Sequence, residues 1–195
     1  MILVTGGTGL VGSHLLYHLS LEHDSIRAIY RSEHSIKKTK SVFDLYTNNT
    51  SLFSKIEWFQ ADLTEVPSMI PAFKGVEYVY HCAAFISFKP NDYREMRKIN
   101  IHGTAIVSNL AIDAKVKKLC YVSSIAAVGD ALPNKFIDEN CMWNKELDNS
   151  GYSITKFGGE MEIWRASQEN VDVVIVNPGV ILGSGFWKSG SGKLF

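Results

Sequence analysis

The chain has 195 residues, of which 46% are apolar and 21% charged, and its 20 basic residues balance 20 acidic ones. This composition predicts one globular domain with a sizeable core. The neutral balance, with a single short basic run at residues 37–40 that we expect on a solvated surface, gives no electrostatic reason to propose nucleic acid or an anionic membrane as a partner.

The cysteines and the N-terminus bear on location and on metal binding. Cys82, Cys120 and Cys141 are odd in number, widely spaced and without a CxxC pair, so we expect reduced thiols. The six histidines show no spacing typical of ligands, and we predict no metal site. The chain begins with a short apolar run and then glycines, without a signal peptide or a membrane span. We therefore expect a cytoplasmic protein.

Short apolar runs alternate with helical patterns, which predicts an α/β fold with a parallel sheet. Residues 173–176 are all β-branched, as in a strand that helices cover on both faces. Segment 31–55 is less regular and predicts one or two short helices, around residues 42–45 and 51–55. The predicted strands span residues 1–5, 25–30, 56–61, 76–82, 118–123 and 171–177.

Apolar residues at helical spacing predict two crossover helices, over residues 10–21 and 92–114. Each helix should bury one apolar stripe against the sheet. The stripe of the first helix consists of Val11, Leu15, Leu16 and Leu19, and that of the second consists of Met96, Ile99, Ile106, Val107 and Leu110.

A glycine-rich segment joins the first strand to the first helix. It can be read as GxGxxG from Gly7 or as GxxGxxG from Gly6. Either reading permits a tight turn and close backbone approach to a pyrophosphate, which the amides at the helix N-terminus attract. The strand, turn and helix in succession predict a dinucleotide site, and its residues are Gly6, Thr8, Gly9, Leu10, Val11 and Gly12.

The end of the second strand bears on the choice of cofactor. An acidic residue there would bind the ribose 2′-hydroxyl, whereas an arginine would accommodate a 2′-phosphate. This strand ends at Arg31 with no Asp or Glu at its tip, which favours NADP(H). Glu33, two residues further on, keeps NAD(H) open.

Tyr152 and Lys156 lie four residues apart, so on a helix they share one face. A nearby ammonium would lower the pKa of the phenol from about 10 and fit it for general acid-base catalysis. The YxxxK spacing also arises by chance in many chains, so its meaning depends on the motifs around it.

In this order the motifs resemble the extended short-chain dehydrogenase/reductase superfamily, the NAD-dependent epimerase/dehydratase family. The resemblance covers essentially all 195 residues. It implies one NAD(P)-binding domain over residues 1–195, a Rossmann-type doubly wound parallel sheet with helices on both faces. Members continue into a C-terminal substrate lobe, which we expect to be largely absent from this chain. The remaining motifs are Asp62-Leu63, His81-Cys82-Ala83-Ala84, Asn100, Ser123-Ser124, Tyr152 with Lys156, and Asn177-Pro178-Gly179-Val180.

Within the superfamily, the segment from Ser123 to Val128, with Asp138-Glu139 and Trp143, is most similar to the dihydroflavonol reductase and 3β-hydroxysteroid dehydrogenase-like branch. Sugar-nucleotide epimerases and dehydratases usually carry Tyr-Gly where this chain has Val128-Gly129.

The resemblance implies an oxidoreductase that transfers hydride between a nicotinamide cofactor and the carbonyl or alcohol group of a small molecule. Tyr152 would exchange the proton, Lys156 would lower the Tyr152 pKa and bind the nicotinamide ribose, and Ser124 would orient the substrate oxygen, with Ser123 as the alternative. A nucleotide-sugar epimerase/dehydratase and a non-catalytic NAD(P)-sensing regulator are the competing functions. Further cofactor contacts are implied at Asp62, Leu63, Ala83, Ala84, Asn100, Pro178 and Val180.

Three expectations remain open at this point. Asn100 either faces the site or is a solvated or helix-bending asparagine. The aromatic residues Phe85, Phe88 and Trp143 either form an apolar substrate wall or pack the core. The resemblance also implies a homodimer through the helices that hold Asn100 and Tyr152.

Overall fold

The computed structural model describes residues 1–130 and 136–186. Its centre is a sheet of six parallel strands in the order β3-β2-β1-β4-β5-β6. All six predicted strands are confirmed, with ends that move by at most two residues, and the predicted fold class is confirmed as well. The strands are β1 (Ile2–Thr5), β2 (Ile26–Tyr30), β3 (Ile56–Gln60), β4 (Tyr78–His81), β5 (Lys118–Val122) and β6 (Asp172–Val176).

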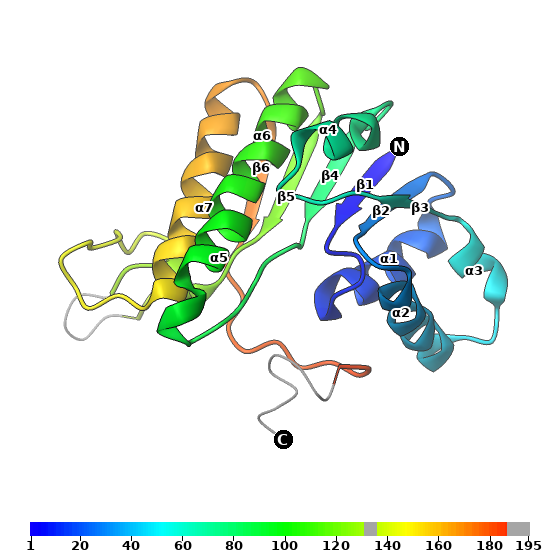
Figure 1. Ribbon diagram of the computed structural model, residues 1–195, viewed down its shortest axis with the longest axis horizontal. Helices are drawn as coiled ribbons and strands as arrows, with labels where there is room; N and C mark the ends of the chain where they lie inside the picture. The colour runs from blue at the N-terminus through cyan, green and yellow to red at the C-terminus, as the bar shows by residue number, and fades with distance from the viewer. Residues whose placement is uncertain (131–135, 187–195) are drawn as a thin grey trace.

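The strand order reverses between β1 and β4. From β1 the chain continues outward to β2 and β3 on one side, and from β4 it continues outward to β5 and β6 on the other. In such sheets a ligand binds outside the carboxyl ends of the strands at this switch point. All six carboxyl ends lie along the lower edge of the sheet in Figure 1. We call this the carboxyl edge.

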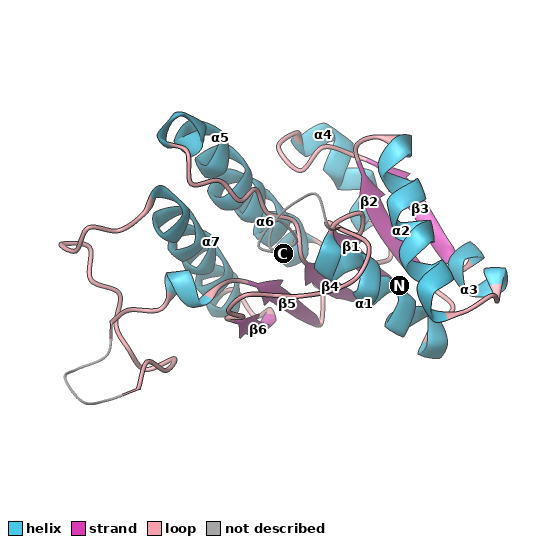
Figure 2. Cartoon of the chain, turned by 90° about the horizontal axis from the view of Figure 1, so that it is seen from below, coloured by secondary structure: helices cyan, strands magenta, loops and turns pink. Residues whose placement is uncertain are grey.

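Helices cover the two faces of the sheet unequally (Figures 1 and 2). One face, over β1 to β3, is covered by α1 (Leu10–Glu22), α2 (Glu33–Tyr46) and α3 (Thr50–Ser54). The other face carries α4 (Val66–Met69), the 3₁₀ turn η1 (Ile70–Phe73), α5 (Tyr93–Arg97), α6 (Thr104–Asp113) and α7 (Gly151–Gln168).

Strand β6 does not have the double coverage that its β-branched run predicts. Val174 and Val176 are each 42% exposed, because no helix of the described residues covers β6 on the α1 side of the sheet (Figure 2). Val173 and Ile175, which point to the α7 side, pack against the larger of two apolar cores. The prediction of helices on both faces therefore holds for the sheet but is wrong for this strand.

The helix predicted over residues 92–114 is one continuous rod of three helical types. A 3₁₀ turn η2 (Pro90–Asp92) leads into α5, a π-helical segment η3 (Lys98–Gly103) follows, and α6 completes the rod. Of the predicted stripe, Met96, Val107 and Leu110 are buried. The π-helical register turns Asn100 into the interior as well. Insertions of this kind are frequent at functional sites.

Helices α1 and α2 differ from their predicted form. In α1 only Leu16 and Leu19 of the predicted stripe are buried, and the other buried positions are small residues, Gly12, Ser13 and Ser20. Small side chains face the sheet there because the helix packs closely behind the glycine turn. Helix α2 has 14 residues rather than one short turn, with Thr39, Val42 and Phe43 buried.

Candidate active site

The glycine turn follows β1 at the carboxyl edge, and its backbone requires glycine at two positions. Gly6 has φ +68°, and a Cβ there would lie 2.5 Å from the backbone nitrogen of Ala83. A Cβ on Gly12 would overlap the carbonyl oxygen of Gly6. The Gly9 amide donates to that same oxygen at 2.9 Å. The turn is thus closed tightly against the residues that follow β4.

The start of α1 is suited to an anion. Gly9 is the N-cap and provides no side-chain hydrogen bond, and the first turn holds no acidic residue. The backbone amides at this end therefore keep the partial positive charge of the helix N-terminus. Thr8, Leu10 and Val11 are half-buried around it. These residues fit a pyrophosphate, as the sequence predicts.

A support of the turn was missed by the sequence analysis. Thr39 of α2 is fully buried and donates its hydroxyl hydrogen to the Gly7 carbonyl oxygen at 3.1 Å. It lies within the basic run at 37–40, whose three lysines are exposed as expected. A polar residue between lysines gives little signal of burial from sequence alone.

Arg31 and Asp62 lie at the neighbouring carboxyl ends of β2 and β3. Asp62 accepts hydrogen bonds from the Thr64 amide and the Thr64 hydroxyl, both at 2.8 Å. The hydrogen bond from the Thr64 backbone amide is the main reason that the Asp62 pKa lies below its usual range, and the Arg31 guanidinium contributes to this lowering. Leu63 is buried and would lie against any side chain added at Gly103. Its contact to a cofactor would therefore be through its backbone.

Asn100 fixes the segment that follows β4. Its amide oxygen accepts from the Phe85 amide at 2.8 Å, and its amide nitrogen donates to the Phe85 carbonyl at 2.9 Å and to the Thr155 hydroxyl at 3.1 Å. The side chain is 1% exposed. Asn100 is therefore neither solvated nor free, and it holds the loop that begins with Ala83 and Ala84 to α7.

Tyr152 and Ser124 meet where α7 begins near the end of β5. The Tyr152 hydroxyl lies close enough to Ser124 for the two side chains to interact. Burial raises the pKa of Tyr152, and the interaction with Ser124 only partly offsets that rise. Ser124 also accepts a hydrogen bond from the Ala126 amide at 3.2 Å, so it caps a short 3₁₀ turn as well.

Lys156 does not act on Tyr152 in the way that its spacing predicts. Its ammonium donates to the Tyr121 hydroxyl at 3.0 Å and to the Val122 carbonyl at 2.9 Å. Lys156 is 1% exposed, and burial lowers its pKa to about 8. The predicted lowering of the Tyr152 pKa by Lys156 is wrong in this structure, because the ammonium is held on β5 and burial raises the phenol pKa.

The segment after β6 closes the site from below in Figure 1. Asn177 donates to the Ser124 carbonyl at 3.1 Å and to Glu160 of α7 at 2.6 Å. The Pro178 carbonyl accepts from the Ile125 amide at 3.0 Å, whereas Val180 is mostly exposed. The Ser123 hydroxyl is buried and has no hydrogen-bond partner among the described residues. It is an unsatisfied group at the edge where a polar ligand is predicted.

The aromatic residues divide between the two interpretations. Trp143 stacks on Phe157 with ring centroids 4.6 Å apart, which is packing. Phe88 is 81% exposed, and its ring meets the Tyr152 ring edge-on at 6.0 Å. Phe85 is half-buried, with its backbone held by Asn100.

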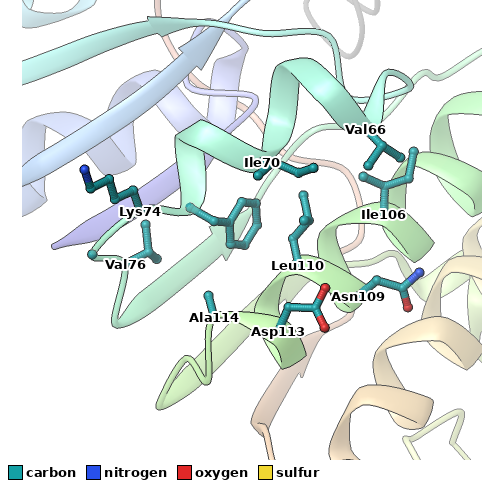
Figure 3. A pocket seen from close by; sticks show the side chains of 11 residues that line it. Val66, Ile70, Lys74, Val76, Ile106, Asn109, Leu110, Asp113 and Ala114 are labelled. Atoms are coloured by element: carbon teal, nitrogen blue, oxygen red, sulfur yellow. The ribbon is translucent and has the colours of Figure 1, made fainter.

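A hollow of about 620 Å³ lies far from these residues (Figure 3). Val66 and Ile70 form one side of it, and Ile106 and Leu110 of α6 form the other. It also touches Val76, just before β4, so it belongs to the edge where the strands begin. None of the predicted site residues lines it.

The family model described as "NAD dependent epimerase/dehydratase family" matches residues 2–194. The chain belongs to the NAD-dependent epimerase/dehydratase family. It is 31% identical over 193 residues to anthocyanidin reductase of Arabidopsis thaliana, covering 93% of this chain and 55% of that protein. It is 29% identical over 181 residues to sterol demethylase protein B of Methylococcus capsulatus, and this match covers 93% of this chain and 51% of that protein.

Solved structures of similar fold include yeast methylglyoxal/isovaleraldehyde reductase complexed with NADPH, with a TM-score of 0.76, 19% identity and coverage of 95% of this chain and 59% of that one. A short-chain dehydrogenase/reductase superfamily protein from Agrobacterium tumefaciens with bound NAD has a TM-score of 0.71, 25% identity and coverage of 91% and 48%. The chain spans about half the length of the curated relatives it matches.

No helix in residues 1–130 and 136–186 is long and apolar enough to cross a membrane. The same ranges hold no group of three or more His, Cys, Asp or Glu side chains placed to hold a metal ion. The three cysteines are free.

Proposed function

We propose that the protein is an NAD(P)-dependent oxidoreductase that transfers hydride between the nicotinamide and a carbonyl or alcohol group of a small molecule. One observation carries this proposal: Tyr152, at the start of α7, lies beside Ser124, just after β5, at the same carboxyl edge as the glycine turn. The turn that we propose to hold the phosphates and the proposed proton donor therefore share one edge of one sheet.

The roles of the side chains follow from their protonation and contacts. The bound cofactor supplies or accepts the hydride. Tyr152, whose pKa is raised by burial, holds its proton at neutral pH and can give it to a carbonyl oxygen during reduction. Ser124, which lies beside Tyr152, would hold that oxygen next to the phenol. Lys156 supplies a positive charge and ammonium donors for the nicotinamide ribose.

The substitution Tyr152→Phe tests this assignment in the full-length protein. NADPH oxidation with a panel of aldehydes and ketones should fall at least ~100-fold, the low end of general acid-base contributions, while NADPH binding is retained. Tyr78→Phe, at the opposite edge of the sheet, is the matched control. Near-normal turnover of Tyr152→Phe would remove the phenol from the mechanism.

The same assays separate the competing functions. Cofactor binding without consumption on any carbonyl would favour an NAD(P)-sensing regulator. Conversion of a nucleotide sugar without net consumption of cofactor would favour an epimerase or dehydratase.

We propose NADP(H) as the preferred cofactor. Arg31 is exposed directly after β2, and no acidic residue stands at that strand tip. An arginine there can pair with a 2′-phosphate. The dissociation constant of NADPH should be lower than that of NADH, and Arg31→Ala should remove most of the difference. Tighter binding of NADH would overturn the preference.

We further propose a cytoplasmic homodimer that associates through the helical rod that holds Asn100 and through α7, which holds Tyr152. Helix α7 carries three apolar residues that are between 38% and 49% exposed, namely Ile154, Met161 and Trp164. They form an apolar surface that a second copy of the chain would cover. Light scattering of the full-length protein should give twice the monomer mass. A monomer at micromolar concentration would rule out this interface.

A further inference from the structure

Tyr121 of β5 is a buried residue for which the sequence analysis proposed no role. It is 1% exposed, and its hydroxyl accepts a hydrogen bond from the Lys156 ammonium at 3.0 Å. The same ammonium lies 4.4 Å from the centre of the Tyr121 ring. One side chain of the sheet thus contacts Lys156 through both its hydroxyl and its π face.

The fold makes room for this contact. A Cβ on Gly159, three residues after Lys156 in α7, would overlap the Tyr121 hydroxyl. The other face of the ring stacks on His81 of β4, with ring centroids 5.2 Å apart. Glycine inside a helix lowers its stability, so its presence here fits a need for close approach.

Behind Tyr121 a buried chain of hydrogen bonds runs to the glycine turn. Thr104 donates its hydroxyl hydrogen to the Asn100 carbonyl at 2.7 Å. A hydroxyl has one hydrogen to donate, so the Thr104 oxygen can only accept from its other neighbours.

The direction of the remaining bonds follows in the same way. His81 Nε2 lies 2.9 Å from the Thr104 hydroxyl and Nδ1 lies 2.6 Å from the Thr5 hydroxyl. Full burial lowers the His81 pKa to about 3, so the ring is neutral and carries one N–H. Since the Thr104 hydrogen is committed, Nε2 donates to Thr104 and Nδ1 accepts from Thr5.

We infer that Tyr121 is a positioning residue whose hydroxyl holds the Lys156 ammonium at the end of β5 and favours its charged form. The catalytic consequence rests on the proposed function, because the charge acts there beside cofactor and substrate. The other titratable groups around Lys156 are His81 of β4, Cys82 directly after that strand, and Glu160 and Tyr152 of α7. Of these, only Glu160 and Cys82 raise the Lys156 pKa, against the lowering by burial.

The substitution Tyr121→Phe removes the hydroxyl and keeps the ring that stacks on His81 and lies under the ammonium. Loss of one hydrogen bond to the charged form should lower the Lys156 pKa by about one unit. NMR of protein labelled with ¹³C at lysine Cε reports this pKa directly, and the Lys156 signal is identified by its absence in Lys156→Met. The expected wild-type midpoint is about 8. The control Tyr80→Phe changes a tyrosine of β4 on the opposite face of the sheet and should leave that midpoint unchanged.

In the full-length enzyme the same variant should move the basic limb of the kcat/KM profile down by about one pH unit and lower kcat about fivefold at pH 8. Absence of turnover in the wild type would refute the proposed function and leave the NMR test intact. Wild-type turnover with identical Lys156 midpoints and identical pH profiles in Tyr121→Phe would refute the positioning role.

A second pair of variants covers the case in which Tyr121→Phe does not fold. Gly159→Ala adds a Cβ that would overlap the Tyr121 hydroxyl and displaces it, whereas Gly158→Ala adds a Cβ that meets the Ile101 side chain instead. The Lys156 midpoint should fall in Gly159→Ala and stay at the wild-type value in Gly158→Ala. Equal midpoints in the two glycine variants would contradict the proposed role of the Tyr121 hydroxyl.

Discussion

Replacing Lys156 by methionine should change the pH dependence of folding stability in a defined direction. The pKa of this lysine falls from 10.5 to about 8 in the folded protein because of burial. Between these two values the unfolded chain binds more protons than the folded one, so the stability of the wild type rises with pH. At about 1.36 kcal/mol per unit, a shift of this size corresponds to roughly 3 kcal/mol in total, of which about 2.5 kcal/mol is gained between pH 7 and 10.

Methionine fills the same space and does not titrate. The free energy of unfolding, measured by urea denaturation at unit steps of pH, should therefore rise in the wild type relative to Lys156→Met by about 2.5 kcal/mol between pH 7 and 10. Lys38→Met removes an exposed lysine of α2 and controls for the loss of a charge as such. A constant difference between wild type and Lys156→Met across this range would refute the argument that burial destabilises the ammonium.

Three further outcomes follow from the described contacts. Gly6→Ala should cost at least ~1 kcal/mol and abolish cofactor binding in calorimetry, because an alanine there has a left-handed φ and its Cβ would lie 2.5 Å from the Ala83 nitrogen. Arg27→Met should cost roughly 1–3 kcal/mol in thermal denaturation, since Arg27 is buried and donates to Glu57 and two backbone carbonyls, and Glu57→Gln should cost less. The His81 ring signals in NMR should not titrate between pH 5 and 8, because its pKa is about 3, and a midpoint near 6.5 would contradict its burial.

The sheet could be predicted because its strands are short apolar runs between clear turn residues. The run at 173–176 gave the position of β6 correctly, since four β-branched residues favour a strand whatever covers it. Coverage depends on distant segments, and for that reason the exposure of Val174 and Val176 could not be read from the run itself.

The helices were harder to predict where their buried residues are polar or small. Helix α2 buries only Thr39, Val42 and Phe43 of its 14 residues, so most of its length carries no apolar period. The π-helical segment changes the register by part of a turn, and no periodicity of 3.6 reveals it. Asn100 is turned inward by that change, which the sequence left open.

In the candidate site, the sequence predicted which residues share a face of α7, but it did not predict their partners in the sheet. The YxxxK spacing placed Tyr152 and Lys156 on one face of α7, yet the ammonium is bound by Tyr121 of β5, 35 residues earlier. Two signals were present: Leu119 and Tyr121 alternate toward the same face of β5, and two consecutive glycines, Gly158 and Gly159, lie within α7 shortly after the lysine. A glycine within a helix indicates close approach by another group, without saying which one.

The protonation of Tyr152 and Lys156 also bears on the proposed reaction. Reduction of a carbonyl needs the proton on Tyr152 and the charge on Lys156, and both are present at neutral pH because the phenol pKa is raised and the lysine pKa is about 8. Oxidation of an alcohol needs the Tyr152 phenolate together with the Lys156 ammonium. The ammonium is lost above about pH 8, before the phenol gives up its proton, so this combination is a minor species at every pH. The protonation of Tyr152 and Lys156 at neutral pH is therefore the one from which the proposed carbonyl reduction starts.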